Sequence, residues 1–408
     1  MGHNAIIGQS GGPTSVINSS LAGVFSVCRR RGVRQVYGMR FGVQGLLKEQ
    51  LVDLSALLSS PLSIELLQRT PASYLGSCRY KLPDYRQDAS VYEALFALLN
   101  RLDIGYFFYI GGNDSMDTIL KLSEYAAAVG SDIRFVGVPK TIDNDLMITD
   151  HTPGYGSAAK YIGVTTKEIV RDATIYDMKS VTILEIMGRN AGWLTAAAAL
   201  AQDEDCEGAS MICLPEIAFD PERFLAQVER AQRVSPSLVV AVSEGVRAAD
   251  GHYICELADD ALSVDPFGHK YLSGTARYLC GLIGRRLGSK TRAVELSTLQ
   301  RCAAHTASRT DVEEAYQCGG AAATAALDGQ TGMMVALRRL SDDPYLCVTE
   351  LHDIHEVANL EKTVPLEWID AENARMKEDF LAYARPLILS EVTPMYVRGL
   401  PRHLRLER

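Results

Sequence analysis

The chain has 408 residues, of which 47% are hydrophobic and 22% are charged, so it is long enough for two or three globular domains and too apolar for an intrinsically disordered protein. Its formal net charge of −9 excludes a general electrostatic attraction to nucleic acid or to an anionic membrane, and neither is expected as a partner. No apolar run reaches the roughly 20 residues that cross a bilayer, and the first residues resemble neither a signal peptide nor a myristoylation motif. The nine cysteines include no C-x-x-C pair. A cytoplasmic protein without a zinc site or a disulfide framework is therefore expected.

Short apolar runs that end in glycine, serine or proline recur along the chain, with helical patterns between them. This alternation is typical of strand–turn–helix units in a parallel sheet, so the predicted fold class is α/β. The clearest helical pattern covers residues 91–102, and a short alanine-rich helix is expected over residues 193–201. The predicted strands are residues 5–7, 106–110, 135–138, 181–186 and 238–242.

Ligands of open α/β sheets gather at the carboxyl ends of the strands, and the loops that follow the predicted strands are polar and rich in glycine. The first loop, GQSGGPT at residues 8–14, contains Gly12 and leads into a helix from about residue 15. Glycines let backbone amides approach an oxyanion, which favours phosphate binding over a plain tight turn. The second loop, GGNDSM from Gly111, adds Asn113 and Asp114 after Gly112. Asp114 is interpreted as a metal ligand or an electrostatic gate, with a helix N-cap as the alternative.

The third loop, PKTIDND at residues 139–145, places a cation, a hydroxyl and carboxylates directly after a predicted buried strand. Phosphoryl transfer to an alcohol needs a base near the hydroxyl, a cation near the travelling phosphoryl group and a carboxylate near the metal. Lys140, Thr141, Asp143 and Asp145 supply these groups. A solvated turn with capping side chains is the alternative.

Further along the chain, charged side chains follow two more predicted strands. Arg189 in MGRNAGW is suited to hold a phosphate, as are Arg292 and Arg301 nine residues apart, although lone arginines are usually solvated. Glu244 ends an apolar strand and could accept hydrogen bonds from sugar hydroxyls. The G-x-G-x-x-A pattern at residues 154–159 follows no clear strand, so a dinucleotide site is not favoured there.

Taken together, GGNDS at 111–115, PKTIDND at 139–145, MGR at 187–189, SEG at 243–245 and R-x8-R at 292–301 resemble the phosphofructokinase family, over residues from about 4 to about 330. The resemblance implies two similar Rossmann-like α/β domains with the active site in the cleft between them. The expected donor-binding domain is residues 1–155 plus about 300–350, and the expected sugar phosphate-binding domain is about 156–299 plus 351–408.

The resemblance also implies a role for each matching residue. Asp143 is expected to act as the base that takes the proton of the sugar's 1-hydroxyl, assisted by Lys140, Asp114 and Arg189. One arginine of the clamp comes from a neighbouring subunit in this family, which implies a homodimer or homotetramer. The expected donor-binding residues are Gly12, Gly112, Asp114 and Lys140, and the expected sugar phosphate-binding residues are Thr141, Asp143, Asp145, Met187, Gly188, Arg189, Glu244, Arg292 and Arg301.

The phosphoryl donor is inferred from two positions. Relatives that use ATP carry glycine where this chain has Asp114 and Lys140, whereas relatives that use inorganic pyrophosphate carry Asp and Lys. Asp114 would repel the α-phosphate of a nucleotide, and Lys140 would compensate the charge of pyrophosphate. The expected substrates are therefore fructose 6-phosphate and pyrophosphate, with Mg²⁺ as cofactor and with Asn113 and Asp145 as candidate metal ligands. An ATP-dependent 6-phosphofructokinase and a non-catalytic regulatory subunit of the same fold are the alternatives.

Overall fold

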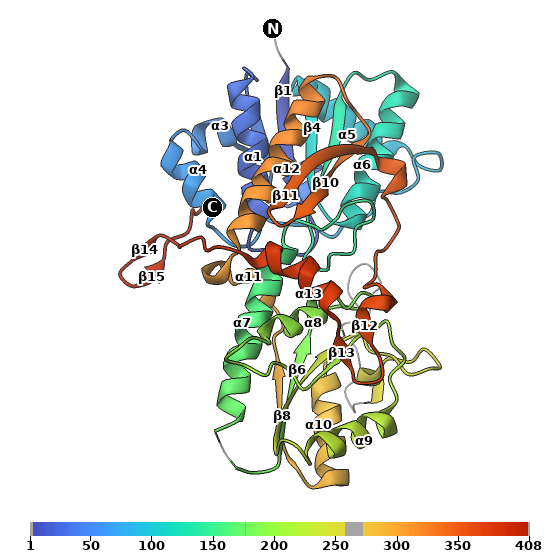
Figure 1. The fold of residues 1–408 in the computed structure, drawn as a ribbon. Helices are drawn as coiled ribbons and strands as arrows, with labels where there is room; N and C mark the ends of the chain where they lie inside the picture. The colour runs from blue at the N-terminus through green and yellow to red at the C-terminus, as the bar shows by residue number, and fades with distance from the viewer. Residues whose placement is uncertain (1–2, 176, 258–271, 407–408) are drawn as a thin grey trace.

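The computed structural model describes residues 3–175, 177–257 and 272–406, and it forms two lobes, each built on its own sheet (Figure 1). The upper sheet has seven strands in the order β11-β10-β5-β4-β1-β2-β3. Neighbouring strands are parallel from β10 to β2, whereas β3 and β11 are antiparallel to the strands beside them. The strands are β1 (Asn4–Gln9), β2 (Val36–Met39), β3 (Leu51–Asp53), β4 (Ile104–Gly111), β5 (Arg134–Pro139), β10 (Met333–Asp342) and β11 (Tyr345–Asp353).

Helices cover both faces of the upper sheet, because successive side chains of a strand point to opposite faces. Ile7 of β1 packs in one buried cluster with residues of α1 and α12, and Ile6 packs in another with residues of α5 and α6. Both faces are apolar, which explains the continuous apolar runs in the sequence. The helices of this lobe are α1 (Ile17–Arg30), α2 (Gly42–Leu46), α3 (Leu54–Leu57), α4 (Pro61–Gln68), α5 (Ser90–Arg101), α6 (Asn113–Val129) and α12 (Arg309–Leu327).

The lower sheet has four parallel strands in the order β7-β8-β6-β9. Val181 and Ile183 of β6 face a cluster with α9 and α10, whereas Leu184 and Ile186 face the cluster that contains α7 and α8. The strands are β6 (Ser180–Ile186), β7 (Met211–Cys213), β8 (Ser237–Ser243) and β9 (Lys290–Glu295), and the helices are α7 (Tyr155–Ala173), α8 (Trp193–Ala196), α9 (Pro221–Ala231), α10 (Thr275–Leu287) and α11 (Leu299–Cys302).

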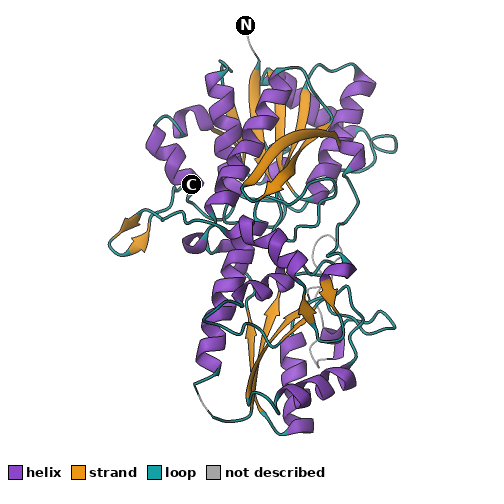
Figure 2. Ribbon diagram, in the orientation of Figure 1, coloured by secondary structure: helices purple, strands orange, loops and turns teal. Residues whose placement is uncertain are grey.

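After β11 the chain passes from the upper lobe to the lower lobe, where it adds a short hairpin and a helix (Figures 1 and 2). The hairpin pairs β12 (Ile369–Asp370) with β13 (Arg375–Met376), and α13 (Glu378–Ala384) buries Phe380 in the same cluster as α7 and α8. A second hairpin, β14 (Tyr396–Val397) and β15 (Leu400–Pro401), precedes the return of the chain to the upper lobe, where the Leu404 amide donates to Oγ1 of Thr70 at 2.8 Å.

The predicted α/β class is confirmed, and each of the five predicted strands exists, extended by one to three residues. Residues 193–201 form α8 and a turn of 3₁₀ helix (Ala197–Ala201) rather than one α-helix. All nine cysteines are free thiols. Within the described ranges, no helix is long and apolar enough to cross a membrane.

Candidate active site

The parallel strands of both sheets direct their carboxyl ends toward the junction of the lobes (Figure 2). In the upper lobe, β1, β4 and β5 are parallel neighbours, so the three loops that follow them meet. The Lys140 amide donates to the carbonyl of Gly111 at 3.0 Å, and the hydroxyls of Ser10 and Ser115 lie 2.5 Å apart. In the lower lobe, β6 is followed by Met187, β8 by Glu244 and β9 by the segment before α11. The loops that carry most of the predicted residues therefore lie at one junction.

Lys140 is the central cation of the upper loops. Its side chain is buried, and Nζ donates to the carbonyl of Gly12 at 2.6 Å, which ties the third loop to the first. Burial lowers the pKa of Lys140 to about 8, although Asp143 and Asp145 act in the opposite direction. A buried ammonium beside two carboxylates and a glycine-rich loop is suited to receive an anionic phosphate.

The carboxylates of the third loop are held by the shape of that loop. The Asp143 amide donates to Oγ1 of Thr141 at 3.1 Å. Asn144 adopts a left-handed conformation at φ 56°, and its side chain donates to the hydroxyl of Tyr383 at 2.8 Å and accepts from the Thr152 amide at 3.0 Å. Asn144 is therefore a structural residue that orients the carboxylates on either side of it.

Burial raises the pKa of Asp143, while Lys140 and Arg189 oppose that rise. Burial also raises the pKa of Asp145, and the charge of Asp143 raises it further. A carboxyl group whose pKa lies above its usual range is a better proton acceptor when ionised, which suits a general base. The two carboxylates are therefore close enough for the charge of Asp143 to act on Asp145.

On the lower side, the SEG segment packs tightly against the MGR segment. Oγ of Ser243 donates to the Gly188 carbonyl at 2.5 Å, and a Cβ added to Gly245 would lie 2.0 Å from the Arg189 carbonyl, so only glycine fits there. Burial, reinforced by Asp143, raises the pKa of Glu244 to about 8. Arg189 acts on the pKa of both Asp143 and Glu244, which places its charge between the two lobes.

The two arginines of the predicted clamp are separated. A Cβ built on Gly12 would lie 3.7 Å from Nη1 of Arg301, and Arg301 acts on the pKa of Lys140 and Asp143, so it belongs to the junction. Arg292 instead lies exposed on the edge strand β9, where Nη1 is 3.1 Å from Oδ2 of Asp172. One chain alone therefore does not form the clamp.

Asp114 and Asn113 have partners that the sequence did not indicate. Oδ1 of Asp114 lies 3.2 Å from Nζ of Lys81, and both side chains are about half exposed. Oδ1 of Asn113 accepts from the Asn359 amide at 2.6 Å, and Nδ2 donates to the Leu360 carbonyl at 2.8 Å. The side chain of Asn113 thus holds the C-terminal segment, and a role in metal binding stays a prediction.

Further residues at the junction were not predicted. Arg79 lowers the pKa of Lys140, which indicates that its charge is close, and the Cys78 carbonyl accepts from the Gly11 amide at 3.3 Å. Oε1 of Gln300 accepts from the Met187 amide at 3.2 Å, which joins α11 to the MGR segment. Arg79 and Lys81 lie in residues 69–89, which the structure shows as a long loop without helix or strand, and such loops are often functional.

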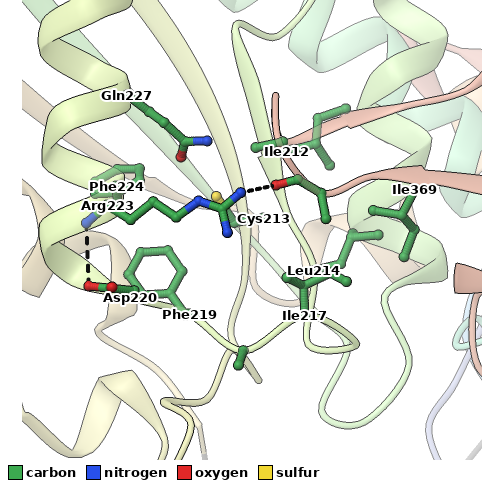
Figure 3. Close-up of a pocket in the computed structure, with 13 residues that line it drawn as sticks. Ile212, Cys213, Leu214, Ile217, Phe219, Asp220, Arg223, Phe224, Gln227 and Ile369 are labelled. Atoms are coloured by element: carbon green, nitrogen blue, oxygen red, sulfur yellow. Dashed lines mark hydrogen bonds between the residues drawn. The ribbon is translucent and has the colours of Figure 1, made fainter.

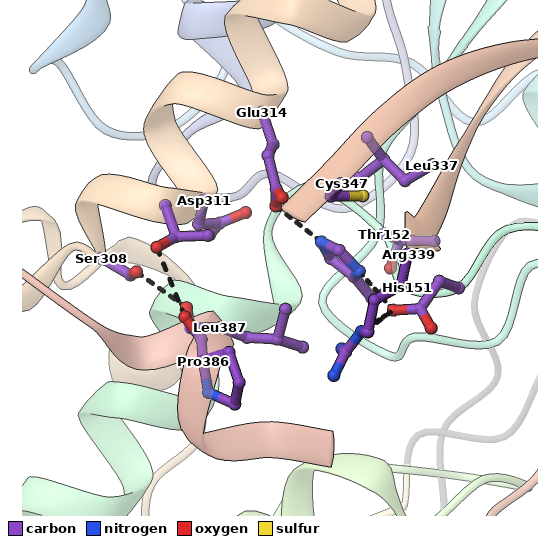
Figure 4. Close-up of polar contacts among 12 residues, drawn as sticks. His151, Thr152, Ser308, Asp311, Glu314, Leu337, Arg339, Cys347, Pro386 and Leu387 are labelled. Atoms are coloured by element: carbon purple, nitrogen blue, oxygen red, sulfur yellow. Dashed lines mark hydrogen bonds and ion pairs between the residues drawn. The ribbon is translucent and has the colours of Figure 1, made fainter. Parts of the chain in front are cut away.

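A buried charge network lies beside the third loop (Figure 4). Nδ1 of His151 is 2.8 Å from Oδ2 of Asp150, and Nε2 is 2.6 Å from Oε2 of Glu314. Arg339 lies 2.9 Å from the same Asp150 oxygen, and the Tyr345 hydroxyl donates to Glu314 at 2.6 Å. Burial alone would lower the pKa of His151, but the two carboxylates outweigh it and raise the pKa to about 9. His151 is therefore a cation at neutral pH.

A mostly apolar cavity in the lower lobe contains none of the predicted site residues (Figure 3). It lies between α9, the segment of residues 212–220 that leads into α9, and the hairpin of residues 369–374. Nη2 of Arg223 donates to the Ala371 carbonyl at 2.7 Å across the cavity. The Asp220 carboxylate accepts from the Glu222 amide, and Nε2 of Gln227 donates to the Glu372 carbonyl, so the polar side chains Arg223, Asp220 and Gln227 each have a protein partner. The residues that line it are Ile212, Cys213, Leu214, Ile217, Ala218, Phe219, Asp220, Arg223, Phe224, Gln227, Ile369, Ala371 and Ala374.

Comparisons with known proteins agree with this geometry. The phosphofructokinase family model matches residues 4–326. A protein of Methylococcus capsulatus named "Pyrophosphate--fructose 6-phosphate 1-phosphotransferase" is 44% identical over 407 residues, which cover 99% of this chain and 96% of that protein. A protein of Halomonas elongata with the same name is 42% identical over 410 residues, which cover 100% of this chain and 96% of that protein.

A crystal structure described as a pyrophosphate-dependent phosphofructokinase from Nitrosospira multiformis is also similar to the chain. Its TM-score is 0.89 at 39% sequence identity, with 100% of this chain and 97% of the other covered. The resemblance inferred from the loop motifs is thereby confirmed, together with the two-lobed α/β fold. The chain belongs to the phosphofructokinase family.

Proposed function

We propose that this protein transfers a phosphoryl group from inorganic pyrophosphate to the 1-hydroxyl of fructose 6-phosphate, giving fructose 1,6-bisphosphate and phosphate. The reaction exchanges a phosphoanhydride for a phosphate ester without a nucleotide, and it runs in both directions. Support comes from the relatives that carry this name at 42–44% identity over nearly the whole chain. The observation that carries the proposal is the buried Lys140, bonded to Gly12 at 2.6 Å with Asp143 in the same loop.

The transfer divides among residues of the two lobes. The Asp143 carboxylate takes the proton from the sugar's 1-hydroxyl as that oxygen bonds to the distal phosphorus of pyrophosphate. The bridging P–O bond breaks, and inorganic phosphate leaves. Lys140 and Arg189 balance the negative charge of the phosphoryl group during the transfer, because both act on the pKa of Asp143 and so lie within electrostatic reach of it.

The preference for pyrophosphate follows from the second loop. Asp114 stands at the start of α6, paired with Lys81 at 3.2 Å. Its carboxylate is proposed to border the position that the rest of a nucleotide would need. A carboxylate there repels a third phosphate and leaves room for the two of pyrophosphate. Gly12, Gly112, Asp114 and Lys140 are proposed to bind the donor, in a donor-binding domain of residues 1–155 plus about 300–350.

Fructose 6-phosphate is proposed to bind on the lower side, in a domain of about 156–299 plus 351–408, although the last residues of that range return to the upper lobe at Leu404. Glu244 accepts hydrogen bonds from the sugar hydroxyls, and Thr141, Asp145 and the MGR segment surround the reacting end. Arg301 binds the 6-phosphate. Arg292 is exposed and paired with Asp172, so we propose that it serves the site of a second copy in a homodimer or homotetramer.

Magnesium is the proposed cofactor. Mg²⁺ prefers one or two carboxylates plus the oxygens of phosphate substrates, and the buried pair Asp143 and Asp145 fits that preference. Asp145 is the proposed ligand, and the ion would neutralise pyrophosphate and polarise its bonds. Within the part of the chain that the structure describes, no three His, Cys, Asp or Glu side chains form a metal-binding cluster. The cytoplasm is the proposed location of the enzyme.

The test is turnover of fructose 6-phosphate with Mg²⁺ and either pyrophosphate or ATP at equal concentration. Turnover with pyrophosphate alone supports the proposal. Turnover with ATP alone would keep the family and refute the donor assignment. Absence of turnover with both would favour a non-catalytic subunit.

A further inference from the structure

A short segment after β11 touches all three groups of residues that the proposed reaction needs. It covers residues 359–364, here called the strap, and it runs where the chain passes from the upper to the lower lobe (Figure 1). The sequence motifs of the active site all lie before it, and the family model ends at residue 326. Its contacts therefore add something that the motifs do not contain.

The strap begins at the second loop, residues 111–116, here called the donor loop. The Asn359 amide donates to Oδ1 of Asn113 at 2.6 Å, and the Leu360 carbonyl accepts from Nδ2 of Asn113 at 2.8 Å. One amide side chain at the start of α6 therefore makes two hydrogen bonds with successive residues of the strap. This pairing is specific to an amide, because it needs one donor and one acceptor on the same side chain.

The middle of the strap contacts the third loop, residues 139–145, here called the catalytic loop, and the backbone that follows it. The Lys362 amide donates to the Asp145 carbonyl at 2.8 Å. Nζ of Lys362 donates to the carbonyls of Thr149 and Asp150 at 3.0 and 2.7 Å, and it lies 5.2 Å from the centre of the Trp193 ring. These contacts fix the backbone on both sides of the turn that follows Asp145, because one partly buried cation is bonded to two carbonyls of that backbone.

The strap ends against residues 187–193 of the lower lobe, here called the sugar loop. Oε2 of Glu361 accepts from Nδ2 of Asn190 at 3.0 Å, directly after the MGR segment. Nε1 of Trp193 donates to the Lys362 carbonyl at 3.0 Å. Glu216 accepts from the Val364 amide at 3.0 Å and from the Gly192 amide at 2.8 Å, so one carboxylate joins the strap to the loop before α8.

We propose that the strap sets the distance between the donor loop, the catalytic loop and the sugar loop, with Lys362 as its central positioning residue and Asn113 as its anchor on the donor side. The strap touches no reacting atom in this account. It acts by keeping Asp143 and Lys140 in register with the sugar held by the lower lobe. A shift of about 1 Å between reacting groups lowers a rate by as much as about 100-fold, so a lost strap contact is expected to appear in kcat.

The first experiment compares Lys362→Met with Lys377→Met in steady-state turnover of pyrophosphate and fructose 6-phosphate. Lys377 is the matched control, because its Nζ also donates to a backbone carbonyl, that of Glu367 at 2.8 Å, outside the strap. Lys362→Met is expected to lower kcat about 10- to 100-fold and to change both KM values less than about threefold. Lys377→Met is expected to retain kcat within about twofold. Equal kcat values for the two variants would overturn the proposal.

A second pair of variants avoids a buried position. Glu361 is exposed, and Gln at this position still accepts the hydrogen bond from Asn190, whereas Ala does not. Glu361→Ala is expected to lower kcat about threefold or more, and Glu361→Gln is expected to restore it to within about twofold of the wild type. If Lys362→Met does not fold, this pair decides. Equal kcat values for Ala and Gln would overturn the proposal.

Asn113→Asp separates the anchor from a metal ligand. A carboxylate binds Mg²⁺ at least as well as an amide, so a metal role predicts an unchanged or tighter magnesium requirement with retained kcat. The strap role predicts a lower kcat with an unchanged magnesium requirement, because aspartate cannot donate to the Leu360 carbonyl. Retained kcat with tighter magnesium binding would remove Asn113 from the strap.

The inference rests on the proposed function for these kinetic readouts, so hydrogen exchange supplies one that needs no substrate. In Lys362→Met, peptides of residues 139–154 and 187–193 are expected to exchange faster than in the wild type, with unchanged exchange in the upper sheet. This result with an inactive wild type would refute the proposed function and keep the strap. Unchanged exchange in both peptides would overturn the strap.

Discussion

Lys140 supplies the most informative perturbation of the proposed donor site. Lys140→Met keeps the length of the side chain and removes its charge. In the structure the ammonium group is buried and donates to the Gly12 carbonyl at 2.6 Å, in a region where little water screens its charge. Removing one preorganised charged donor that contacts the transferring phosphoryl group raises the activation free energy by about 3 to 4 kcal/mol. The value of kcat/KM for pyrophosphate is therefore expected to fall about 10²- to 10³-fold.

The pKa of Lys140 adds a second signature to this prediction. Burial lowers that pKa to about 8, so the charged form is lost as the pH rises through 8. In the wild type, kcat/KM for pyrophosphate is therefore expected to decrease tenfold per pH unit above about 8. Burial also lowers the pKa of Lys362 to about 8, so part of the decrease can come from that residue. Lys140→Met is therefore expected to show a shallower decrease than the wild type, since it lacks the proton that Lys140 loses.

The assay is a pH series from 6 to 10 with varied pyrophosphate and saturating fructose 6-phosphate. Saturating sugar keeps Glu244, whose pKa is also about 8, covered by its substrate throughout. Circular dichroism at each pH serves as the control for folding. A flat wild-type profile between pH 7 and 9, or a variant that keeps kcat/KM within tenfold, would refute the role given to Lys140.

Four further changes test other parts of the site. Asp143→Ala is expected to lower kcat about 10²- to 10⁴-fold with little change in KM for the sugar, measured by steady-state kinetics. Asp114→Gly is expected to raise KM for pyrophosphate and to admit some turnover with ATP, measured with both donors side by side. Arg292→Ala is expected to raise KM for fructose 6-phosphate, and mixing it with the inactive Asp143→Ala is expected to restore sites whose two residues come from different copies. The pKa of His151 rises from 6.5 to about 9 on folding, so its contribution to stability is complete below pH 6.5 and is lost as the pH rises through 9. Between pH 6 and pH 10, the free energy of unfolding in urea is therefore expected to fall by about 3 kcal/mol more in the wild type than in His151→Gln.

Each of these has an outcome that contradicts it. Near-normal turnover of Asp143→Ala removes that residue from proton transfer. An unchanged donor preference in Asp114→Gly refutes the gate. An unchanged sugar KM in Arg292→Ala, or no recovery on mixing, refutes the shared site. Parallel stability curves of wild type and His151→Gln between pH 6 and 10 would contradict the ion pairs of His151.

Strands buried on both faces could be predicted because they are written as continuous apolar runs. β1, β4, β5, β6 and β8 all satisfy this condition, and each was identified from the sequence. β9 could not be identified, because it is an edge strand with alternating exposed residues and three charged side chains among six. An edge strand satisfies fewer hydrophobic constraints, so its sequence carries a weaker pattern.

The glycine-rich pattern at residues 154–159 illustrates a motif whose context decides its meaning. It begins α7, and Gly154 has φ 114° with Thr14 so close that a Cβ would lie 2.7 Å from it. The glycine therefore permits a close approach between two loops of the chain. The absence of a preceding strand was the sequence feature that argued against a dinucleotide site.

The loops of the site were visible in the sequence, whereas their mutual support was not. Asn113 and Leu360 are 247 positions apart, and Lys362 and Asp150 are 212 apart. No local pattern records contacts over such distances, because they depend on how the two lobes and the C-terminal segment pack. The exposure of Arg292 likewise became visible only when β9 was placed at a sheet edge.

The most direct test of the donor assignment follows phosphorus by ³¹P NMR in both directions without any nucleotide. With Mg²⁺, pyrophosphate and fructose 6-phosphate, the account predicts that the pyrophosphate signal decreases while fructose 1,6-bisphosphate and phosphate increase in equal amounts. Starting from fructose 1,6-bisphosphate and phosphate, it predicts that pyrophosphate forms. Spectra that remain unchanged in both directions, from a folded protein that converts fructose 6-phosphate once ATP is added, would contradict the account.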